Sequence, residues 1–129
     1  MFTPHVNDTG AVLPWEYMAA AAGAYKAGQL VTVTGGKITA IGAALKTTPP
    51  YLCMADITVE DGGTVPVTRV QKNVIYKAQL GAAAAEAVPG TKLEVSAGGL
   101  LADAAAAGTF ELTYLEGTAV GDNVYGRFD

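Results

Sequence analysis

Short runs of alternating apolar and polar residues, separated by glycine pairs, form the clearest pattern in the chain. Two such runs, Leu30–Thr34 and Lys37–Ile41, are linked by Gly35-Gly36 alone. A Gly-Gly link suits a two-residue primed turn, because both central residues need φ > 0 and glycine has no Cβ to oppose it. The pattern therefore predicts a β-hairpin in which Val33 lies opposite Ile38.

The same alternation continues through the rest of the chain. Tyr51–Val59 is predicted as one long strand, Asp61-Gly62-Gly63 supplies the next turn, and Thr64–Val70 is predicted as the returning strand. Pro66 marks an edge position or a bulge in the returning strand, because proline cannot donate a ladder hydrogen bond. Further strands are predicted at Asn73–Leu80, Thr109–Leu115 and Asn123–Phe128, and a second hairpin at Leu93–Ala97, Gly98-Gly99 and Leu100–Ala104.

Two segments depart from the strand pattern. Gly81–Ala87, which reads GAAAAEA, is the best candidate for a short helix and is followed by the breaker Val88-Pro89-Gly90. Prolines and a glycine interrupt residues 1–24, which are therefore predicted to be an extended N-terminal arm. The expected fold is mostly β. It is a small barrel or sandwich of hairpins over residues 25–129, either as one domain or as two small lobes joined around residues 81–90.

Composition narrows the range of partners. The 129 residues carry a net charge of −4, and the eight Lys and Arg residues are scattered, so no basic stripe is available for nucleic acid. No run approaches the ~20 apolar residues of a membrane span, and the N-terminus has no secretion signal, so a cytosol-made, unprocessed protein is expected. Only 16% of the residues are charged, which is compatible with a surface partly covered in an assembly.

Residues that carry enzyme chemistry are few and scattered. His5 is the only histidine and is expected to be an exposed arm residue, while Cys53 is the only cysteine and is expected to be a small buried thiol. Asp56, Glu60 and Asp61 lack the alternating spacing of a calcium loop. A phosphate loop needs a Ser or Thr directly after its Gly-Lys pair and a helix after that. The Gly-Gly-Lys tip of the first hairpin has neither. No enzyme activity, metal or other cofactor is therefore expected.

The predicted arm ends in a cluster of aromatic residues that contains the only tryptophan, Trp15, beside Tyr17. Two interpretations of these rings remain open. They cap the core of their own domain, or they anchor the arm on a neighbouring subunit. In the second interpretation the candidate partner-binding residues of the arm are His5, Val12, Leu13, Trp15, Tyr17 and Met18.

Four segments, in this order and spacing, resemble the strands of the small capsid decoration proteins of tailed bacteriophages, also called cement or head-stabilising proteins. Gly28–Ala40 (GQLVTVTGGKITA) is similar to the opening hairpin of that family, and Pro50–Ala55 to the strand after the connector. Gly63–Val70 (GTVPVTRV) is similar to its G-x-x-V-P-V-x-R strand, and Gly121–Phe128 to its closing strand. The resemblance extends over nearly the whole chain except the arm.

This resemblance implies a structural virion protein and not an enzyme. Proteins of the family bind the outer face of an expanded icosahedral shell, usually near local three-fold positions, as trimers or other small oligomers. The expected partner is the major capsid protein, and the expected location is the virion surface after synthesis in the host cytoplasm. The arm is then expected to order on a capsid subunit by strand addition, with Trp15 and Tyr17 as anchors.

Two other classes of function remain open. A carbohydrate- or surface-binding β module would need a patch of exposed aromatic residues on one sheet, which Tyr76, Tyr114 and Tyr125 could supply. Another phage head or tail component is the third alternative.

Overall fold

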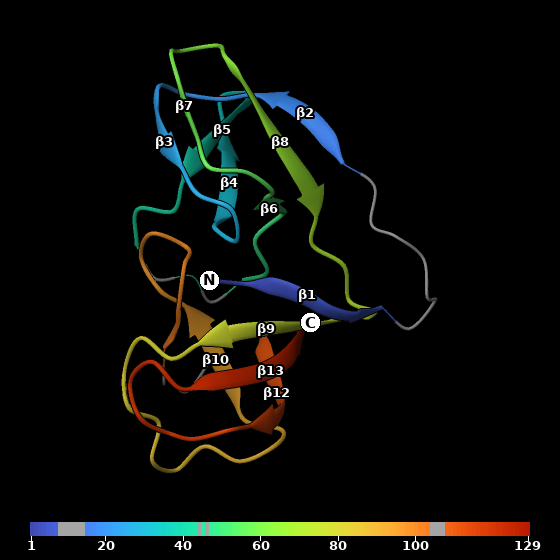
Figure 1. Cartoon of the computed structure of the whole chain (residues 1–129), viewed down its shortest axis with the longest axis vertical. Helices are drawn as coiled ribbons and strands as arrows, with labels where there is room; N and C mark the ends of the chain where they lie inside the picture. Colours follow the sequence, from blue (N-terminus) through green and yellow to red (C-terminus); the bar gives the residue numbers. More distant parts are fainter. Residues whose placement is uncertain (8–14, 44, 46, 104–107) are drawn as a thin grey trace.

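The computed structural model of the chain describes residues 1–7, 15–43, 45, 47–103 and 108–129. The regular structure of these residues is β throughout, in antiparallel sheets and without a helix (Figure 1). One sheet has six strands in the order β1 (Thr3–Asn7), β9 (Val74–Gln79), β13 (Asn123–Phe128), β12 (Phe110–Leu115), β10 (Lys92–Val95) and β11 (Ala102–Asp103). A second has five in the order β2 (Glu16–Ala19), β8 (Thr64–Arg69), β6 (Tyr51–Cys53), β4 (Leu30–Thr34) and β5 (Lys37–Ala40). β3 (Gly23–Tyr25) pairs with β7 (Ile57–Val59).

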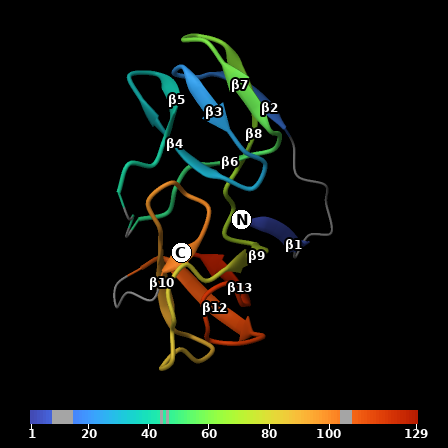
Figure 2. The same ribbon diagram turned by 60° about the vertical axis from the view of Figure 1, so that its left-hand side comes forward.

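The sheets gather at opposite ends of an elongated molecule. In Figures 1 and 2 the five-stranded sheet and the β3–β7 pair lie at the top and the six-stranded sheet at the bottom. The chain passes from one end to the other between β8 and β9, at residues 70–73. Residues 81–90, where the sequence suggests a junction of lobes, connect β9 and β10 within the six-stranded sheet. The mostly β prediction is confirmed, whereas the predicted barrel is not, because the sheets do not close.

The larger hydrophobic cluster lies on the inner face of the six-stranded sheet. Four rings pack there: Phe2 meets Phe110 edge-on at 5.3 Å between ring centroids, and Phe128 lies 5.0 Å from Phe110 and 5.5 Å from Tyr76. The same cluster takes in apolar side chains of the five-stranded sheet, Leu30 of β4 and Leu52 of β6, and Ile41, which follows β5. The two ends of the molecule therefore share one core. A smaller cluster, with Val31, Ile38, Val65 and Val67, fills the five-stranded end.

The N-terminal segment is not the extended arm that the sequence predicts. Its described residues are strands that pair within the chain: β1 with β9 and β2 with β8. Phe2 is buried in the larger cluster. Pro4, a predicted strand breaker, is compatible with a strand here because β1 is an edge strand of its sheet.

The predicted helix over Gly81–Ala87 is also absent, although the structure describes all seven residues. They form bends and turns. Two of their backbone N–H groups bond to distant carbonyls, Gly81 to Ala102 O and Ala84 to Thr118 O, each at 2.8 Å, while Ala87 N–H donates to Ala84 O at 2.9 Å in a single turn. Seven residues are too few for a stable isolated helix, so these long-range bonds decide the conformation.

Glycine turns form at the three predicted positions, but among the described strands only the first and the last of them join strands that pair with each other. In the first hairpin Val33 pairs with Ile38 and Val31 with Ala40, and Gly35 and Gly36 have φ of 59° and 79°. Gly62, with φ of 84°, and Gly63 lie in the turn between β7 and β8.

The second hairpin also has its predicted register, with Val95 opposite Ala102, around Gly98 and Gly99 at φ of 89° and 71°. Its tip packs against the other sheet. Leu30 N–H donates to Gly99 O at 2.7 Å, and a Cβ on Gly99 would overlap the carbonyl oxygen of Leu30.

The single long strand predicted over Tyr51–Val59 is wrong. It divides into β6, which pairs with β8, and β7, which pairs with β3. Pro66 explains the break. Pro66 lies in β8, an inner strand of the sheet, and its backbone faces β6. Its carbonyl oxygen accepts a hydrogen bond from Met54 N–H. Proline has no N–H, so it cannot donate the second hydrogen bond of this pair to Met54. The β6–β8 ladder therefore ends at Cys53, one residue before Met54.

Candidate functional site: an edge strand and an aromatic hollow

Strand β2 is one edge of the five-stranded sheet, and it carries two of the most exposed aromatic side chains. Trp15, directly before it, is 53% exposed, and Tyr17 within it is 72% exposed. Figure 1 shows β2 on the outside of the molecule, and in the sheet order of the described residues its one neighbour is β8. Large rings beside an unpaired strand edge are the usual features of a surface that receives another polypeptide strand.

The direction of the β2 backbone follows from two hydrogen bonds. Ala20 N–H donates inward to Gly63 O at 2.8 Å, whereas Ala21 N–H donates outward to Ile38 O at 2.9 Å. Because successive residues of a strand face opposite sides, the N–H and C=O of Tyr17 face away from β8. The pairing of Tyr17 with Pro66 agrees, because the Pro66 carbonyl faces β6, where it accepts from Met54 N–H, and not β2. At Ala20 the outer side of this segment bridges to Ile38 of β5, so the open edge comprises residues 15–18.

The other side chains of β2 hold the strand in place. Met18 is half-buried and packs against the smaller cluster. Glu16 forms an ion pair with Arg69 at 3.6 Å, and the guanidinium of Arg69 lies 5.3 Å from the centroid of the Tyr51 ring. The ion pair is exposed and contributes little energy.

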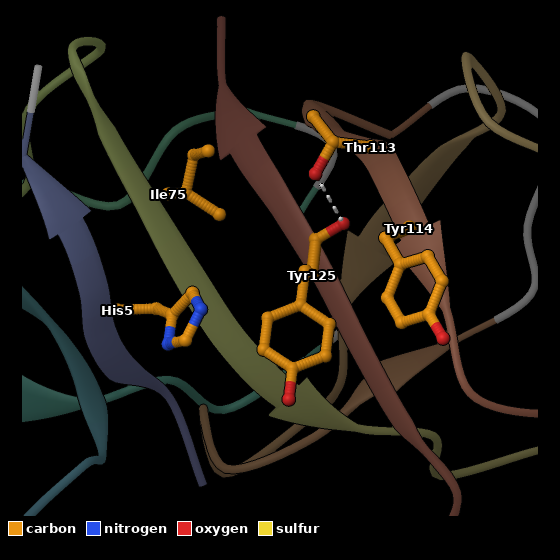
Figure 3. A pocket seen from close by; sticks show the side chains of 5 residues that line it. All are labelled: His5, Ile75, Thr113, Tyr114 and Tyr125. Carbon is orange, nitrogen blue, oxygen red and sulfur yellow. Dashed lines mark hydrogen bonds between the residues drawn. The ribbon is translucent and has the colours of Figure 1, made fainter.

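A second aromatic surface lies on the outer face of the six-stranded sheet. It is a shallow hollow of about 350 Å³ lined by His5, Ile75, Thr113, Tyr114 and Tyr125 (Figure 3). The rings form a row across the strands: the His5 and Tyr125 centroids are 4.8 Å apart, and those of Tyr125 and Tyr114 are 5.7 Å apart. We call this surface the aromatic hollow.

Two β-bulges create the aromatic hollow. In the β12–β13 ladder Leu112 pairs with Gly126 but Tyr114 pairs with Tyr125, so Thr113 is an extra residue. Strict alternation would place Tyr114 on the core face with Leu112, and the bulge instead turns it outward, where it is 58% exposed. A similar shift between Pro4 and Val6 makes His5 the extra residue of β1.

Polar groups surround the rings. Thr113 Oγ1 donates to the carbonyl oxygen of Tyr125 at 3.1 Å, and Tyr125 Oη lies 3.5 Å from Glu116 Oε1. Burial, with a further contribution from the carboxylate of Glu116, raises the pKa of Tyr125, so its hydroxyl keeps its proton. Lys77 lies opposite Tyr125 in β9 and shares its face of the sheet.

The structure separates the residues that the sequence groups as one partner-binding set. Trp15 and Tyr17 lie on the open edge of β2, Met18 is half-buried beside them, and His5 lies in the aromatic hollow on the other sheet. Val12 and Leu13 lie outside the described residues.

The set of tyrosines proposed from the sequence needs a correction. Tyr76 is fully buried in the larger cluster and its hydroxyl accepts from Gln71 N–H, so only Tyr114 and Tyr125 are available at the surface. Sequence reasoning missed Ile75 and Thr113. Tyr76 shares the buried face of β9 with Val74 and Ala78. Because side chains alternate along a strand, this pattern is the signal that could have placed Ile75 on the outer face of the sheet.

The chemistry-bearing residues are engaged in structural contacts. Cys53 is buried, its Sγ donates to Ala55 O at 3.2 Å, and burial raises the pKa of the thiol. Asp56 accepts from Ala27 N–H, while Asp61 pairs at 2.9 Å with Lys37 of the first hairpin tip. Among the described residues no group of three or more His, Cys, Asp or Glu could hold a metal ion. The described part of the chain also contains no helix that could span a membrane.

No protein-family model matches this chain, and a search of curated proteins finds no match.

Proposed function

We propose that this chain is a structural virion protein that binds the outer surface of a phage capsid and stabilises the mature shell by bridging subunits of the major capsid protein. The proposal rests on the likeness of its strand motifs to capsid decoration proteins and, in the structure, on the open edge of β2. That edge offers outward backbone groups at Tyr17 beside the exposed rings of Trp15 and Tyr17. A strand of the capsid protein would pair with β2, and Trp15 and Tyr17 would pack on its side chains.

The stabilisation follows from mass action. A protein that binds only the expanded lattice lowers the free energy of that lattice by an amount that grows with its concentration relative to the dissociation constant. A small oligomer, with a trimer favoured, engages several subunits at once, and effective concentration then multiplies moderate contacts. Each β2 edge therefore needs only moderate affinity.

The direct experiment mixes the purified protein with expanded capsids of the same phage that lack it, followed by sedimentation and imaging of the particles. We expect protein density on the outer surface and greater resistance of the decorated capsids to heat. Capsids that remain bare at saturating protein concentration would refute the proposal.

Point substitutions are better than truncation for locating the contact. Removing residues 1–17 would delete β1 and the core residue Phe2, so a loss of binding would be confounded by unfolding. Trp15→Ala and Tyr17→Ala change only exposed rings. We expect both to weaken capsid binding while the unfolding free energy stays within about 0.5 kcal/mol of the wild-type value.

A further inference from the structure

We propose that the aromatic hollow of the six-stranded sheet binds an uncharged sugar ring. This site goes beyond capsid binding, since it lies on a different sheet from the open edge of β2.

The arrangement of the rings favours a flat, partly apolar ligand. His5, Tyr125 and Tyr114 come from three strands and lie side by side along the sheet (Figure 3). A pyranose has a face of C–H bonds that can rest on such rings and a periphery of hydroxyl groups that remain hydrated. The rings supply contact area at low entropic cost, since each aromatic side chain has only two rotatable χ angles.

The polar rim matches hydroxyl groups better than it matches a single charge. Glu116 is an acceptor beside the Tyr125 hydroxyl, while Lys77 is a donor on the same face. A sugar hydroxyl can donate to the first and accept from the second. An anionic ligand would be repelled by Glu116, and the net charge of −4 adds to that repulsion.

The shape of the hollow argues against a quaternary ammonium ligand. Aromatic cages for cations surround the charge with ring faces. Here the ring planes are inclined by 56° and 41° to their neighbours in a single row, which leaves the hollow open on the solvent side. The volume of about 350 Å³ lies near the lower end of small-ligand pockets, so one or two sugar units fit and a longer glycan would extend beyond the hollow.

The test is an NMR titration of the full chain with four probes: methyl β-D-glucopyranoside, methyl β-D-galactopyranoside, methyl α-D-mannopyranoside and N-acetylglucosamine. We expect at least one to bind saturably, with a dissociation constant of about 1–10 mM and shifts confined to amides of β1, β9, β12 and β13. Tyr114→Ala should weaken that binding about tenfold, because it removes one exposed stacking ring. Tyr125→Phe keeps the ring and should weaken it only about twofold.

Trp15→Ala is the matched control, since it removes an exposed ring from the other sheet and should leave sugar binding unchanged. Tetramethylammonium chloride is the competing probe. The proposal is overturned if no sugar saturates, if Tyr114→Ala binds sugar as well as wild type, or if tetramethylammonium occupies the hollow more tightly than the sugars. These results are independent of capsid binding, which is measured separately through β2.

Discussion

The two ends of the molecule expose aromatic rings in different ways. At the five-stranded end Trp15 and Tyr17 flank an open strand edge, so unpaired backbone groups accompany the rings. At the six-stranded end Tyr114 and Tyr125 lie on the face of a sheet, where the neighbouring strands already satisfy the backbone. An edge can add a strand of another protein, whereas a face can only offer its side chains. The same residue types therefore favour a polypeptide partner at one end and a flat small ligand at the other.

The comparison assumes that the two ends of the molecule unfold together as one cooperative unit. A substitution of Gly99 tests this assumption most strongly. Gly99→Ala would force a Cβ into the carbonyl of Leu30 at a backbone conformation that L-residues avoid. We expect a loss of about 3 kcal/mol in the free energy of unfolding, measured by urea denaturation.

Gly36→Ala is the matched control for that substitution. Gly36 has a similar positive φ of 79°, but a Cβ there would meet open space. Its cost should be only the conformational one, about 1 kcal/mol. Equal losses of unfolding free energy for the two variants would show that the contact between the tip of the second hairpin and β4 contributes little to stability.

An exchange of substitutions tests the division of labour between the two surfaces. The double variant Trp15→Ala/Tyr17→Ala should lower capsid affinity about a hundredfold, since central aromatic residues dominate protein interfaces. Tyr114→Ala should leave capsid affinity unchanged. Sedimentation of each variant with expanded capsids measures the two capsid affinities. If Tyr114→Ala weakened capsid binding as much as the double variant, the six-stranded face would belong to the capsid contact.

The two ends also differ in which buried group titrates first at alkaline pH. Burial raises the pKa of Cys53 above its usual 9.0 and, at the six-stranded end, the pKa of Tyr76 above its usual 10.0. Each stabilising contribution is full below the unfolded-state pKa and is lost as the pH rises through the folded-state pKa, because only the unfolded chain ionises easily. We expect the unfolding free energy to fall above pH 9 by at most about 1.4 kcal/mol per pH unit for each group.

Cys53→Ser isolates the first of these two titrations. It keeps a donor for Ala55 O and removes the thiol, so the decline should begin near pH 10 instead of pH 9. Urea denaturation at intervals between pH 8 and pH 11 measures the onset. An unchanged onset would assign the alkaline decline to other groups.

Local patterns in the sequence were sufficient for the hairpins. Gly35-Gly36 and Gly98-Gly99 fix both turn and register, because glycine pairs select primed turns and the apolar period selects the face. The apolar period also predicts the strand Asn123–Phe128 with its observed bounds.

Features that depend on distant partners could not be read from the sequence. Nothing local indicates that the carbonyls of Ala102 and Thr118 keep Gly81–Ala87 from forming a helix, or that Pro66 ends a ladder across from Met54. The bulge at Thr113 places Tyr114 on the face opposite to Leu112, and a bulge has no reliable signal in an alternating run. The aromatic pair of the β2 edge was found from the sequence, but its neighbours on β8 were not.

The central claim is that a capsid strand pairs with the open edge of β2, and the most direct measurement compares two substitutions of Tyr17. Tyr17→Ala removes the ring and keeps the outward N–H, whereas Tyr17→Pro removes both and leaves the inward bonds to β8 intact. With equal unfolding free energies for the two variants, we expect Tyr17→Pro to bind expanded capsids about tenfold more weakly than Tyr17→Ala. Equal affinities for the two variants would contradict strand addition at β2.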